Sequence, residues 1–482
     1  MNKEYRMLIS NEQFLTRAAI MSGGRVEYLF VSRQDTGACV ANIYKGRIER
    51  IVTGLNAAFV NIGESRNGFL PFGKDEPLYR MPEPEEAGSK QPQTTRRTGE
   101  ELIVQAVRPG TSEKGMKLTT KVSIPGRYII LIPDSSLRTL SKKITDRKER
   151  ERLLNIANKR IFDNTGFIIR TAAEGKNEGY IIRELKILLS IWSKAKRHAR
   201  MKKAPSLVWK EEPVYINAVR DYVTSDFKQI IVDDERTYRE VKRYVNLFLP
   251  EMRGKVLLHK ERIPLFLKHG LEKEIENFLA KKVSLPSGGS LIIEEGETLN
   301  AIDVNSGSSD KSGIRETILN ANLEAAEEIP RQIRARNLSG LIVVDFIDMK
   351  HQRERRKVFK TLSDNLEIDK AQTKILSISK LGIVEMSREK TDFKLSDLLL
   401  EKCERCKGTG YVKNVFFSAL KLRNEVLSRI AKNPGRKFTV ESSSNIYEFI
   451  NGNKLLSEML KKHRIRLREV HAFRESEFKI ID

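Results

Sequence analysis

Two short apolar runs that carry acidic residues stand out in the pattern of hydrophobic and polar positions. Residues 300–307 read NAIDVNSG, and residues 341–348 read LIVVDFID. Apolar, β-branched runs of this length are typical of β-strands. Because side chains alternate along a strand, Asp303 and Asn305 are expected on one face and their apolar neighbours on the other.

An acidic residue on an apolar strand needs a partner, because an unpaired buried carboxylate is costly. Asp303 and Asp345 therefore suggest that a cation lies between two strands. Mg²⁺ is the natural candidate, since proteins typically hold it with one or two carboxylates plus substrate phosphates. The residues alone leave a second interpretation open, in which neighbouring arginines satisfy the acids or the acids cap strand ends.

The first part of the chain is rich in short strand-like runs. Residues 1–36, with a strand at 26–31, are too few to fold alone and are expected to pair with a later segment. Residues 37–124 contain short strands separated by turns, which indicates a small barrel. The polar, Pro-containing stretch 81–97 is expected to be a surface loop. The barrel strands are expected at 39–44, 45–52, 57–63, 68–71, 103–107 and 118–120.

The rest of the chain mixes strands and helices. Asp233 and Asp234, between a strand and a helix, are expected to cap the helix rather than to form a second metal site. Pro330 predicts a kink or a new start within a helix. Helices are expected at 146–152, 181–201, 214–222, 238–248, 313–336, 351–362, 415–431 and 444–460, and strands at 127–132, 166–171, 229–234, 290–295, 375–379, 384–388, 436–441 and 465–470.

Composition and charge narrow the class of protein. The 482 residues are 39% hydrophobic and 32% charged, which is typical of a globular protein with several domains. Lys and Arg number 88 against 64 Asp and Glu, which gives a net charge of +24. This excess favours a polyanionic partner, nucleic acid first and an anionic membrane surface second.

The sequence also predicts the compartment. We find no apolar run long enough for a transmembrane helix and no apolar core of a signal peptide. Three cysteines provide no disulfide framework. A cytoplasmic protein is expected.

A small barrel of the OB type binds single strands by aromatic stacking with basic groups around it. Phe59 and Phe69 are the candidate stacking residues, and Lys45, Arg47 and Lys114 are the candidate phosphate contacts. For Phe59 the residues alone favour another interpretation, a position in the barrel core.

Three further clusters have two interpretations each. Arg170 beside Thr171 can hold a phosphate by charge-assisted hydrogen bonds, or can form a surface salt bridge. The basic run 194–203 can complement the dipole at a helix C-terminus, or can follow an RNA backbone. Cys403 and Cys406 form a CxxC pair followed by glycines, which is half of a structural zinc site, or are two free cysteines.

The motifs AIDVNSG, NLEAAEEIPRQIRARNLSGLIVVDFIDM, LGIVEMSREK and CERCKGTG occur in this order, and the chain there resembles the catalytic core of the RNase E/G family of endoribonucleases. With no long disordered scaffold after the last motif, it is closer to the catalytic-core-only, ribonuclease G-like branch. The resemblance implies that Asp303 and Asp345 bind Mg²⁺ and that Asn305 positions one of them. It also implies that Phe59, Phe69 and Lys114 contact RNA.

The same resemblance implies two further sites. Gly126, Arg170 and Thr171 match a pocket that senses a 5′-monophosphate on RNA, with Gly126 the weaker match. Cys403 and Cys406 match a Zn²⁺ link shared between subunits, so a homodimer or a homotetramer is expected.

The implied activity is Mg²⁺-dependent, single-strand-specific cleavage in rRNA 5′-end maturation and mRNA decay. It is stimulated by 5′-monophosphate ends and leaves 5′-phosphate and 3′-hydroxyl ends. A non-catalytic RNA-binding or ribosome-associated factor is the alternative, and it has no need of Asp303 and Asp345.

The implied fold is a multidomain α/β protein. It comprises an RNase H-like subdomain (1–36 and 212–277), an OB-fold barrel (37–124), a 5′-sensor region (125–211), a DNase I-like catalytic subdomain (278–398), a zinc link (399–414) and a small C-terminal α/β oligomerisation domain (415–482).

Overall fold

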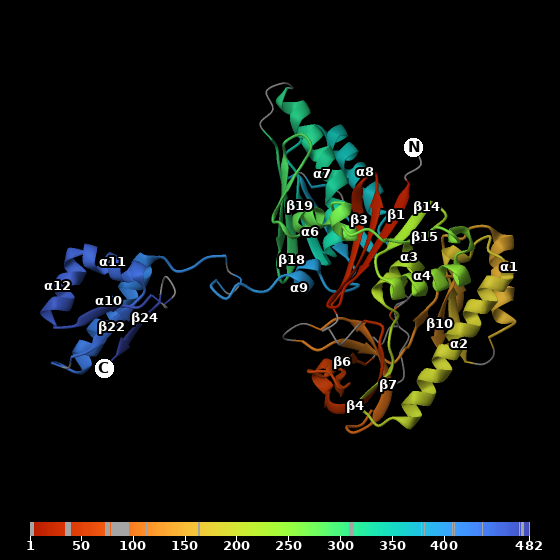
Figure 1. Ribbon diagram of the computed structural model, residues 1–482, viewed down its shortest axis with the longest axis horizontal. Coiled ribbons are helices and arrows are strands. Elements are labelled where there is room, and N and C mark those ends of the chain that lie inside the picture. The colour runs from red at the N-terminus through yellow and green to blue at the C-terminus, as the bar shows by residue number, and fades with distance from the viewer. Residues whose placement is uncertain are drawn as a thin grey trace. The chain divides into compact units, whose positions relative to one another are not determined.

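The computed structural model divides into two units, residues 1–399 and 400–482 (Figure 1). Both mix helices with sheets, and the first contains a closed barrel, which agrees with the expected α/β class. Cys39 and most of the expected loop 81–97 lie outside the described residues. Those described are 4–33, 40–72, 78, 96–110, 114–161, 164–307, 313–376, 378–379, 381–406, 408, 410–435, 437–471, 473 and 477–481.

The N-terminal strands belong to a sheet that is completed two hundred residues later. Its order is β15-β14-β1-β2-β3, and β1 runs parallel to β14, so the early segment pairs with a later one as expected. Helices α3 (Val214–Tyr222) and α4 (Glu235–Phe248) pack against it. The strands are β1 (Tyr5–Asn11), β2 (Leu15–Ser22), β3 (Arg25–Arg33), β14 (Phe227–Val232) and β15 (Val256–Leu258).

The turn between β14 and α4 is held by its two aspartates. The side chain of Asp234 accepts hydrogen bonds from the backbone N–H of Thr237 at 2.7 Å and from its hydroxyl at 2.8 Å. Asp233 accepts one from the backbone N–H of Asn11 at 3.0 Å. The capping interpretation is therefore confirmed for Asp234, whereas Asp233 ties the turn to β1 instead of capping the helix.

The barrel closes in the order β4-β5-β6-β8-β7, with β7 paired back to β4 and β13 (Ser206–Trp209) added outside β4. The separate strands expected at 39–44 and 45–52 are wrong, because a single strand, β4, runs from Ile43 to Val52. Gly46 lets β4 continue across the core, because a Cβ there would lie 2.5 Å from a methyl of Val60. The strands are β4 (Ile43–Val52), β5 (Ala57–Asn61), β6 (Gly68–Pro71), β7 (Glu101–Arg108) and β8 (Lys117–Thr119).

A four-stranded sheet follows the barrel, in the order β11-β12-β10-β9. It packs with two helices, α1 and the long α2, around one apolar core that also contains Ile43 of the barrel. Asn177 caps α2 and starts it three residues before the expected position. The elements are β9 (Ile124–Pro125), β10 (Ile129–Pro133), β11 (Arg138–Leu140), α1 (Arg147–Asn158), β12 (Thr165–Ile169) and α2 (Glu178–Met201).

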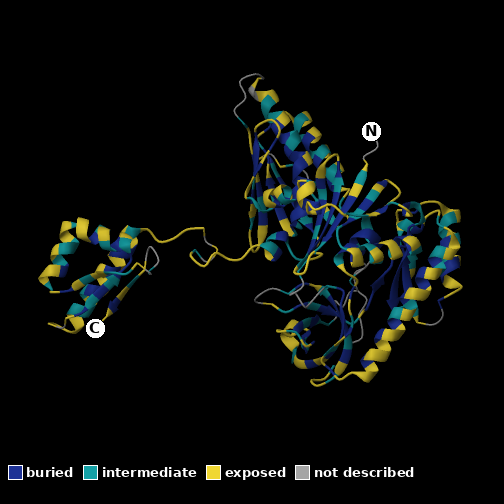
Figure 2. Cartoon of the chain, viewed as in Figure 1, coloured by how far each residue is buried: buried dark blue, intermediate teal, exposed yellow. Residues whose placement is uncertain are grey.

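The last sheet of the first unit contains both acidic strands, and we call it the Asp303 sheet. Its order is β16-β17-β18-β19-β21-β20. Helices α7 (Ile314–Arg336) and α8 (Gln352–Leu366) bury one face, while residues on the other face are exposed (Figure 2). The strands are β16 (Lys282–Ser284), β17 (Ser290–Glu295), β18 (Leu299–Asn305), β19 (Gly340–Asp345), β20 (Thr373–Ile375) and β21 (Ile383–Arg388), and the short helices of this region are α5 (Leu265–Lys268), α6 (Leu271–Leu279) and α9 (Leu395–Leu399).

Helix α7 is continuous through Pro330, so no new helix starts there. A proline has no N–H to offer the carbonyl four residues earlier. Side chains bridge this weakened turn: Glu328 accepts hydrogen bonds from Arg331 at 2.6 Å and from Gln332 at 2.7 Å, all three being buried.

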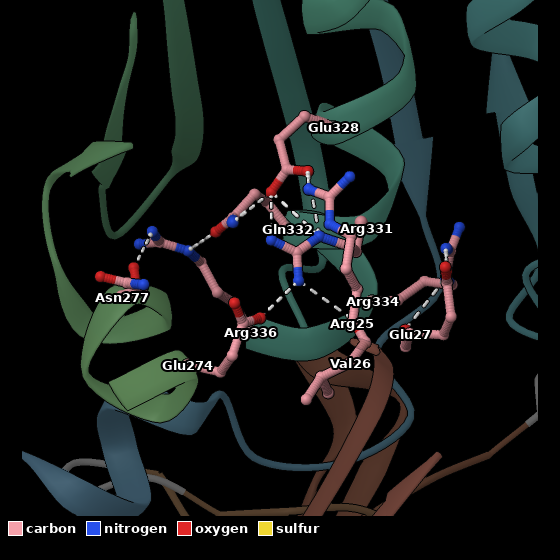
Figure 3. Close-up of polar contacts among 10 residues, drawn as sticks. All are labelled: Arg25, Val26, Glu27, Glu274, Asn277, Glu328, Arg331, Gln332, Arg334 and Arg336. Atoms are coloured by element: carbon pink, nitrogen blue, oxygen red, sulfur yellow. Dashed lines mark hydrogen bonds and ion pairs between the residues drawn. The ribbon is translucent and has the colours of Figure 1, made fainter. Parts of the chain in front are cut away.

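The same cluster ties α7 to other parts of the unit (Figure 3). Arg331 also pairs with Glu274 of α6 at 2.8 Å, and Glu328 with Arg25 of β3 at 2.6 Å. Arg334 pairs with Glu27 of β3 at 2.8 Å. The cluster therefore fixes the Asp303 sheet against the N-terminal sheet.

The second unit has a three-stranded sheet in the order β23-β22-β24. The single helix expected at 444–460 is wrong: it breaks at Asn453, whose side chain caps the second helix by accepting from the N–H of Leu456 at 3.1 Å. Strand β24 was not expected. The elements are α10 (Val415–Lys432), β22 (Thr439–Ser442), α11 (Ser444–Gly452), α12 (Lys454–Lys462), β23 (Arg466–Glu469) and β24 (Phe478–Ile481). In the described part of the chain, no helix combines the length and apolar content needed to cross a bilayer.

Candidate functional site

Asp303 and Asp345 are brought together by the pairing of β18 with β19. The strands are parallel, and the two residues are direct register partners. Paired strands lie about 4.8 Å apart, so the side chains project side by side from the exposed face. Within the described residues no lysine or arginine forms an ion pair with either carboxylate, so the interpretation that arginines satisfy them has no support.

Asn305 lies two residues from Asp303 on the same face of β18. Its Nδ2 donates a hydrogen bond to Oδ2 of Asp303 at 2.7 Å. The turn before β17 closes over this end of the strand, where a Cβ on Gly289 would lie 2.7 Å from the carbonyl oxygen of Asn305. Asn305 therefore fixes the orientation of one carboxylate and leaves the other free.

The chemistry of this donor set fits Mg²⁺. Two adjacent carboxylates provide hard oxygen ligands, and Mg²⁺ usually keeps water and substrate phosphate in its remaining positions. Among the described residues no group of three or more His, Cys, Asp or Glu side chains is placed to hold a metal ion. A complete protein cage of the kind that zinc or calcium prefers is thus not seen in that part of the chain.

The barrel carries a row of cations and aromatic rings on its outer surface. Arg50, Phe59, Phe69 and Lys117 are successive register partners across β4, β5, β6 and β8. The two rings are 5.9 Å apart in an edge contact, and the guanidinium of Arg50 lies 5.1 Å from the ring centre of Phe59. Both rings are half-buried and lie outside the barrel core, so the core interpretation of Phe59 is wrong.

The three candidate lysine and arginine contacts lie in different surroundings. Lys114 is exposed in the turn that leads into β8. Lys45 and Arg47 instead pair with Glu101 at 2.8 and 2.9 Å. Their hydrogen bonds lower the pKa of Glu101 to about 2, so this carboxylate is ionised at neutral pH. Arg50 and Lys117, which the sequence did not single out, are better placed beside the rings.

Arg170 and Gly126 meet at the end of β12. Nη1 of Arg170 donates to the carbonyl oxygen of Gly126 at 2.7 Å and pairs with Oδ1 of Asp221 at 2.6 Å. Arg170 thus forms a salt bridge, but the pair is largely shielded from solvent and does not lie on the surface. Thr171 is exposed next to it, and its hydroxyl donates to Oγ of Ser141 at 3.0 Å. The three expected residues therefore line one region.

Glu184 of α2 explains why position 126 is a glycine. Its buried carboxylate accepts backbone N–H groups of Arg127, Tyr128 and Ile129 at 2.6, 2.6 and 3.0 Å. A Cβ on Gly126 would lie 2.5 Å from the carboxyl carbon of Glu184. Burial raises the pKa of Glu184 against the lowering effect of these bonds.

Lys370, which precedes β20 of the Asp303 sheet, lies near Arg170 and Asp221. Nζ of Lys370 lies 4.3 Å from the ring centre of Tyr222. The residue as a whole is exposed, but desolvation of its ammonium group lowers its pKa to about 8, although Asp221 opposes the shift. Burial would raise the pKa of Asp221, but Arg220 and Arg170 outweigh it and hold that pKa below its usual range. Nothing local in the sequence indicated Asp221 or Lys370, which meet only in the fold.

The profile of the Ribonuclease E/G family matches residues 123–391, from the four-stranded sheet through the Asp303 sheet. The chain belongs to the ribonuclease E/G family. It is 33% identical to Ribonuclease G of Escherichia coli strain K12 over 447 residues, which is 91% of each chain. It is 35% identical over 467 residues to Ribonuclease E of Haemophilus influenzae; the match spans 95% of this chain but only 50% of that relative.

Membership in the ribonuclease E/G family makes the chain an endoribonuclease. The second unit carries the remaining expected site of this family member. Cys403 is exposed and Cys406 half-buried, and neither is in a disulfide. Hydrogen bonds from the backbone of Cys406 and Arg405 lower the pKa of the Cys403 thiol, which favours the thiolate.

Proposed function

We propose that the protein is an Mg²⁺-dependent endoribonuclease that cuts single-stranded RNA and leaves 5′-phosphate and 3′-hydroxyl ends. It acts in rRNA 5′-end maturation and in mRNA decay, and 5′-monophosphate ends stimulate it. The single observation that carries this proposal is the register pairing of Asp303 with Asp345 on an exposed sheet face. A protein that only binds RNA does not need two adjacent carboxylates there, since they repel the phosphate backbone.

Asp303 and Asp345 would hold the metal ion. A bound Mg²⁺ would supply positive charge for the scissile phosphate and would lower the pKa of a water molecule. Asn305 keeps Oδ2 of Asp303 in place by its hydrogen bond, so it orients a carboxylate that would hold the ion. Because both carboxylates are exposed, substrate reaches them without a movement of the sheet.

The barrel would hold the single strand. Phe59 and Phe69, which lie outside the barrel core, would stack on bases, an interaction that is tolerant of sequence. Arg50 and Lys117 lie at either end of the row, and Lys114 is exposed beyond it, so all three are placed for phosphates. Bases need to be unstacked for this arrangement, which explains a preference for single strands.

The 5′-monophosphate would bind beside Arg170 and Thr171. Arg170 has further N–H donors beyond the Nη1 group that binds Gly126 and Asp221, and a guanidinium suits bidentate phosphate contacts. The exposed hydroxyl of Thr171 would donate to the phosphate in place of Ser141, and Lys370 adds positive charge near the pocket.

Zn²⁺ would bind to Cys403 and Cys406 and to the same pair of a second subunit, giving a homodimer or a homotetramer. The lowered pKa of Cys403 supports this, because thiolates are the zinc ligands. Exposed aromatic side chains of the second unit, such as Tyr411 and Phe416, support an interface there. We further propose a cytoplasmic location, and the domain division 1–36 with 212–277 (RNase H-like), 37–124 (OB-fold), 125–211 (5′-sensor), 278–398 (DNase I-like), 399–414 (zinc link) and 415–482 (oligomerisation).

The test is cleavage of a single-stranded RNA oligonucleotide carrying a 5′-monophosphate, a 5′-triphosphate or a 5′-hydroxyl, with and without Mg²⁺. Asp303→Asn and Asp345→Asn should each lower the rate by at least about a hundredfold while thermal melting stays unchanged, because both side chains are exposed. Glu294→Gln is the matched control, an exposed carboxylate on the neighbouring strand that pairs with Lys281 at 2.5 Å. If both aspartate variants are folded and still cleave at the parent rate, the proposal is wrong.

A further inference from the structure

A groove lies where the C-terminal part of α2 passes the outside of the barrel. Figure 1 shows this end of α2 beside β4 and β7. The groove has a volume of about 390 Å³, and its apolar floor comes from Leu102, Ile103 and Ala199. A space of this size with an apolar floor accommodates a nucleobase or a sugar–phosphate unit.

The polar lining of the groove carries an excess of positive charge. Lys45, Lys196 and Arg200 line it together with one acid, Glu101. Glu101 is already compensated by Lys45 and by Arg47. Among the described residues, Lys196 and Arg200 have no carboxylate partner, and so they supply the charge that is not neutralised.

The helix dipole does not account for this charge. Every charged residue between Glu184 and Glu211 is a lysine or an arginine. The dipole acts within the last turn of a helix, and α2 ends at Met201, so Arg200 suits it but Lys196 lies too far from the end. Lys196 instead lies 5.5 Å from the ring centre of Trp192, which orients it along the helix.

The groove is separate from the row of aromatic rings. Lys45 and Arg50 lie on the same strand, five residues or roughly 16 Å apart. Arg47, which is half-exposed, lies between them on the outer surface of β4. The outer surface of β4 therefore connects the rings with the groove, and it carries Arg47 and Arg50 with one acid, Glu49, between them.

We propose that this groove is a second RNA-binding site, which takes the phosphodiester backbone of a single strand that continues beyond the barrel. Lys196 and Arg200 contact phosphates, and the apolar floor receives a base or a ribose. The site lengthens the RNA segment that the protein holds and adds nothing to the chemistry. It is measured by binding, so its failure and a failure of the cleavage proposal are distinguishable.

The experiment compares two doubly substituted full-length chains. Lys196→Glu with Arg200→Glu changes the groove. Lys194→Glu with Arg197→Glu makes the same change of charge on the exposed face of the same helix, outside the groove. Fluorescence anisotropy in EDTA, with RNA integrity checked on a gel, measures binding of 5′-hydroxyl RNA of about 8 and about 25 nucleotides, the first within and the second beyond the span of one OB-fold.

The groove substitutions should weaken binding of the long RNA about tenfold and leave the affinity for the short RNA unchanged. The control variant should bind both RNAs about as tightly as the parent chain does. The slope of log affinity against log salt should fall by about 1.4, or about 0.7 for each lost phosphate contact. Equal losses in the two variants, or no loss in the groove variant, would overturn the proposal. The proposal would also be overturned if AMP bound saturably and the groove substitutions abolished that binding while the affinity for the long RNA stayed unchanged. Lys196→Gln with Arg200→Gln replaces the glutamate pair if that chain does not melt like the parent.

Discussion

Asn305 donates a hydrogen bond to Oδ2 of Asp303, its neighbour two residues away on the same face of β18. Asn305→Leu keeps the side-chain size and removes the donor, so the carboxylate loses its orientation. Loss of such an outer-shell partner typically costs about 10–100-fold in metal affinity or activity. The Mg²⁺ concentration for half-maximal cleavage should therefore rise by about that factor. A variant with an unaltered Mg²⁺ titration would show that this hydrogen bond does not support the site.

The aromatic row predicts a loss of RNA binding without a loss of stability. Phe59→Ala and Phe69→Ala should each weaken single-strand binding by about 1–3 kcal/mol, because a stacked base is lost. Their melting temperatures should change little, since the rings lie outside the barrel core. Leu70→Ala, one residue along and fully within that core, should do the reverse. Anisotropy and thermal melting of the three variants check both halves of this expectation.

Lys370 predicts a pH dependence of the response to the 5′ end. Its pKa of about 8 means that it is cationic below pH 8 and neutral above it. The phosphate is a dianion throughout the range from pH 7 to pH 9, since its second pKa is about 6. The ratio of cleavage rates for 5′-monophosphate and 5′-hydroxyl RNA should therefore fall as the pH rises from 7 to 9.

Two substitutions at the same position separate charge from shape. Lys370→Arg keeps its charge at pH 9, and so the ratio should stay flat. Lys370→Met should give the low ratio at every pH. A ratio that Lys370→Met leaves as in the parent would show that this lysine is not part of the 5′-end response.

Glu328 is predicted to be the most sensitive residue of the cluster around Pro330. Removing one partner of a buried ion pair typically costs about 3–5 kcal/mol, because the other charge is left unpaired. Glu328→Gln leaves Arg331 with only Glu274, so urea unfolding should show a loss of that order. The exposed Glu316, in the first turn of the same helix, is the control.

The stability contributed by Glu328 is predicted to fall as the pH falls. Burial would raise the pKa of Glu328, but the hydrogen bonds and charge of Arg331 hold it below its usual range. The stabilisation is therefore complete above about pH 4.5, the ordinary pKa of a glutamate, and is lost as the pH falls below it. Glu328→Gln should remove this part of the acid sensitivity, whereas Glu316→Gln should retain it.

The cysteine pair predicts a metal-dependent assembly. Treatment with a chelator, or Cys403→Ala with Cys406→Ala, should remove bound zinc and lower the subunit count. Metal analysis and light scattering measure the two quantities. A parent protein without zinc, or an assembly indifferent to both treatments, would contradict the shared link.

Local patterns predicted the elements better than the contacts between them. Helix α3 has the expected bounds of Val214–Tyr222, and α2 and α7 differ from expectation only at their starts, because periodicity and capping are local signals. The break at Asn453 also has a local signal, since an Asn that follows a Gly is a capping signal. The apolar periodicity on both sides of it nevertheless favours a single helix.

The candidate site was predictable in part for the same reason. Alternation placed Asp303 and Asn305 on one face, and the structure agrees. The register that brings Asp345 opposite Asp303 pairs two strands that α7 separates in the sequence, which no short pattern encodes. Asp221, Lys370 and Arg50 were missed because their partners are distant in sequence or across a strand pair.

The pairing of β1 with β14 has a consequence for synthesis of the chain. Asn11 and Asp233, which are hydrogen-bonded across this pairing, are 222 residues apart. At ribosomal elongation rates, β1 stays unpaired on its β14 side for on the order of 10–40 s, until β14 has been synthesised. The barrel has no such delay, because all its closing strands lie within the inserted segment. Chaperone demand during translation should thus concentrate on the earliest thirty residues, and slowing elongation past them should favour aggregation through that edge.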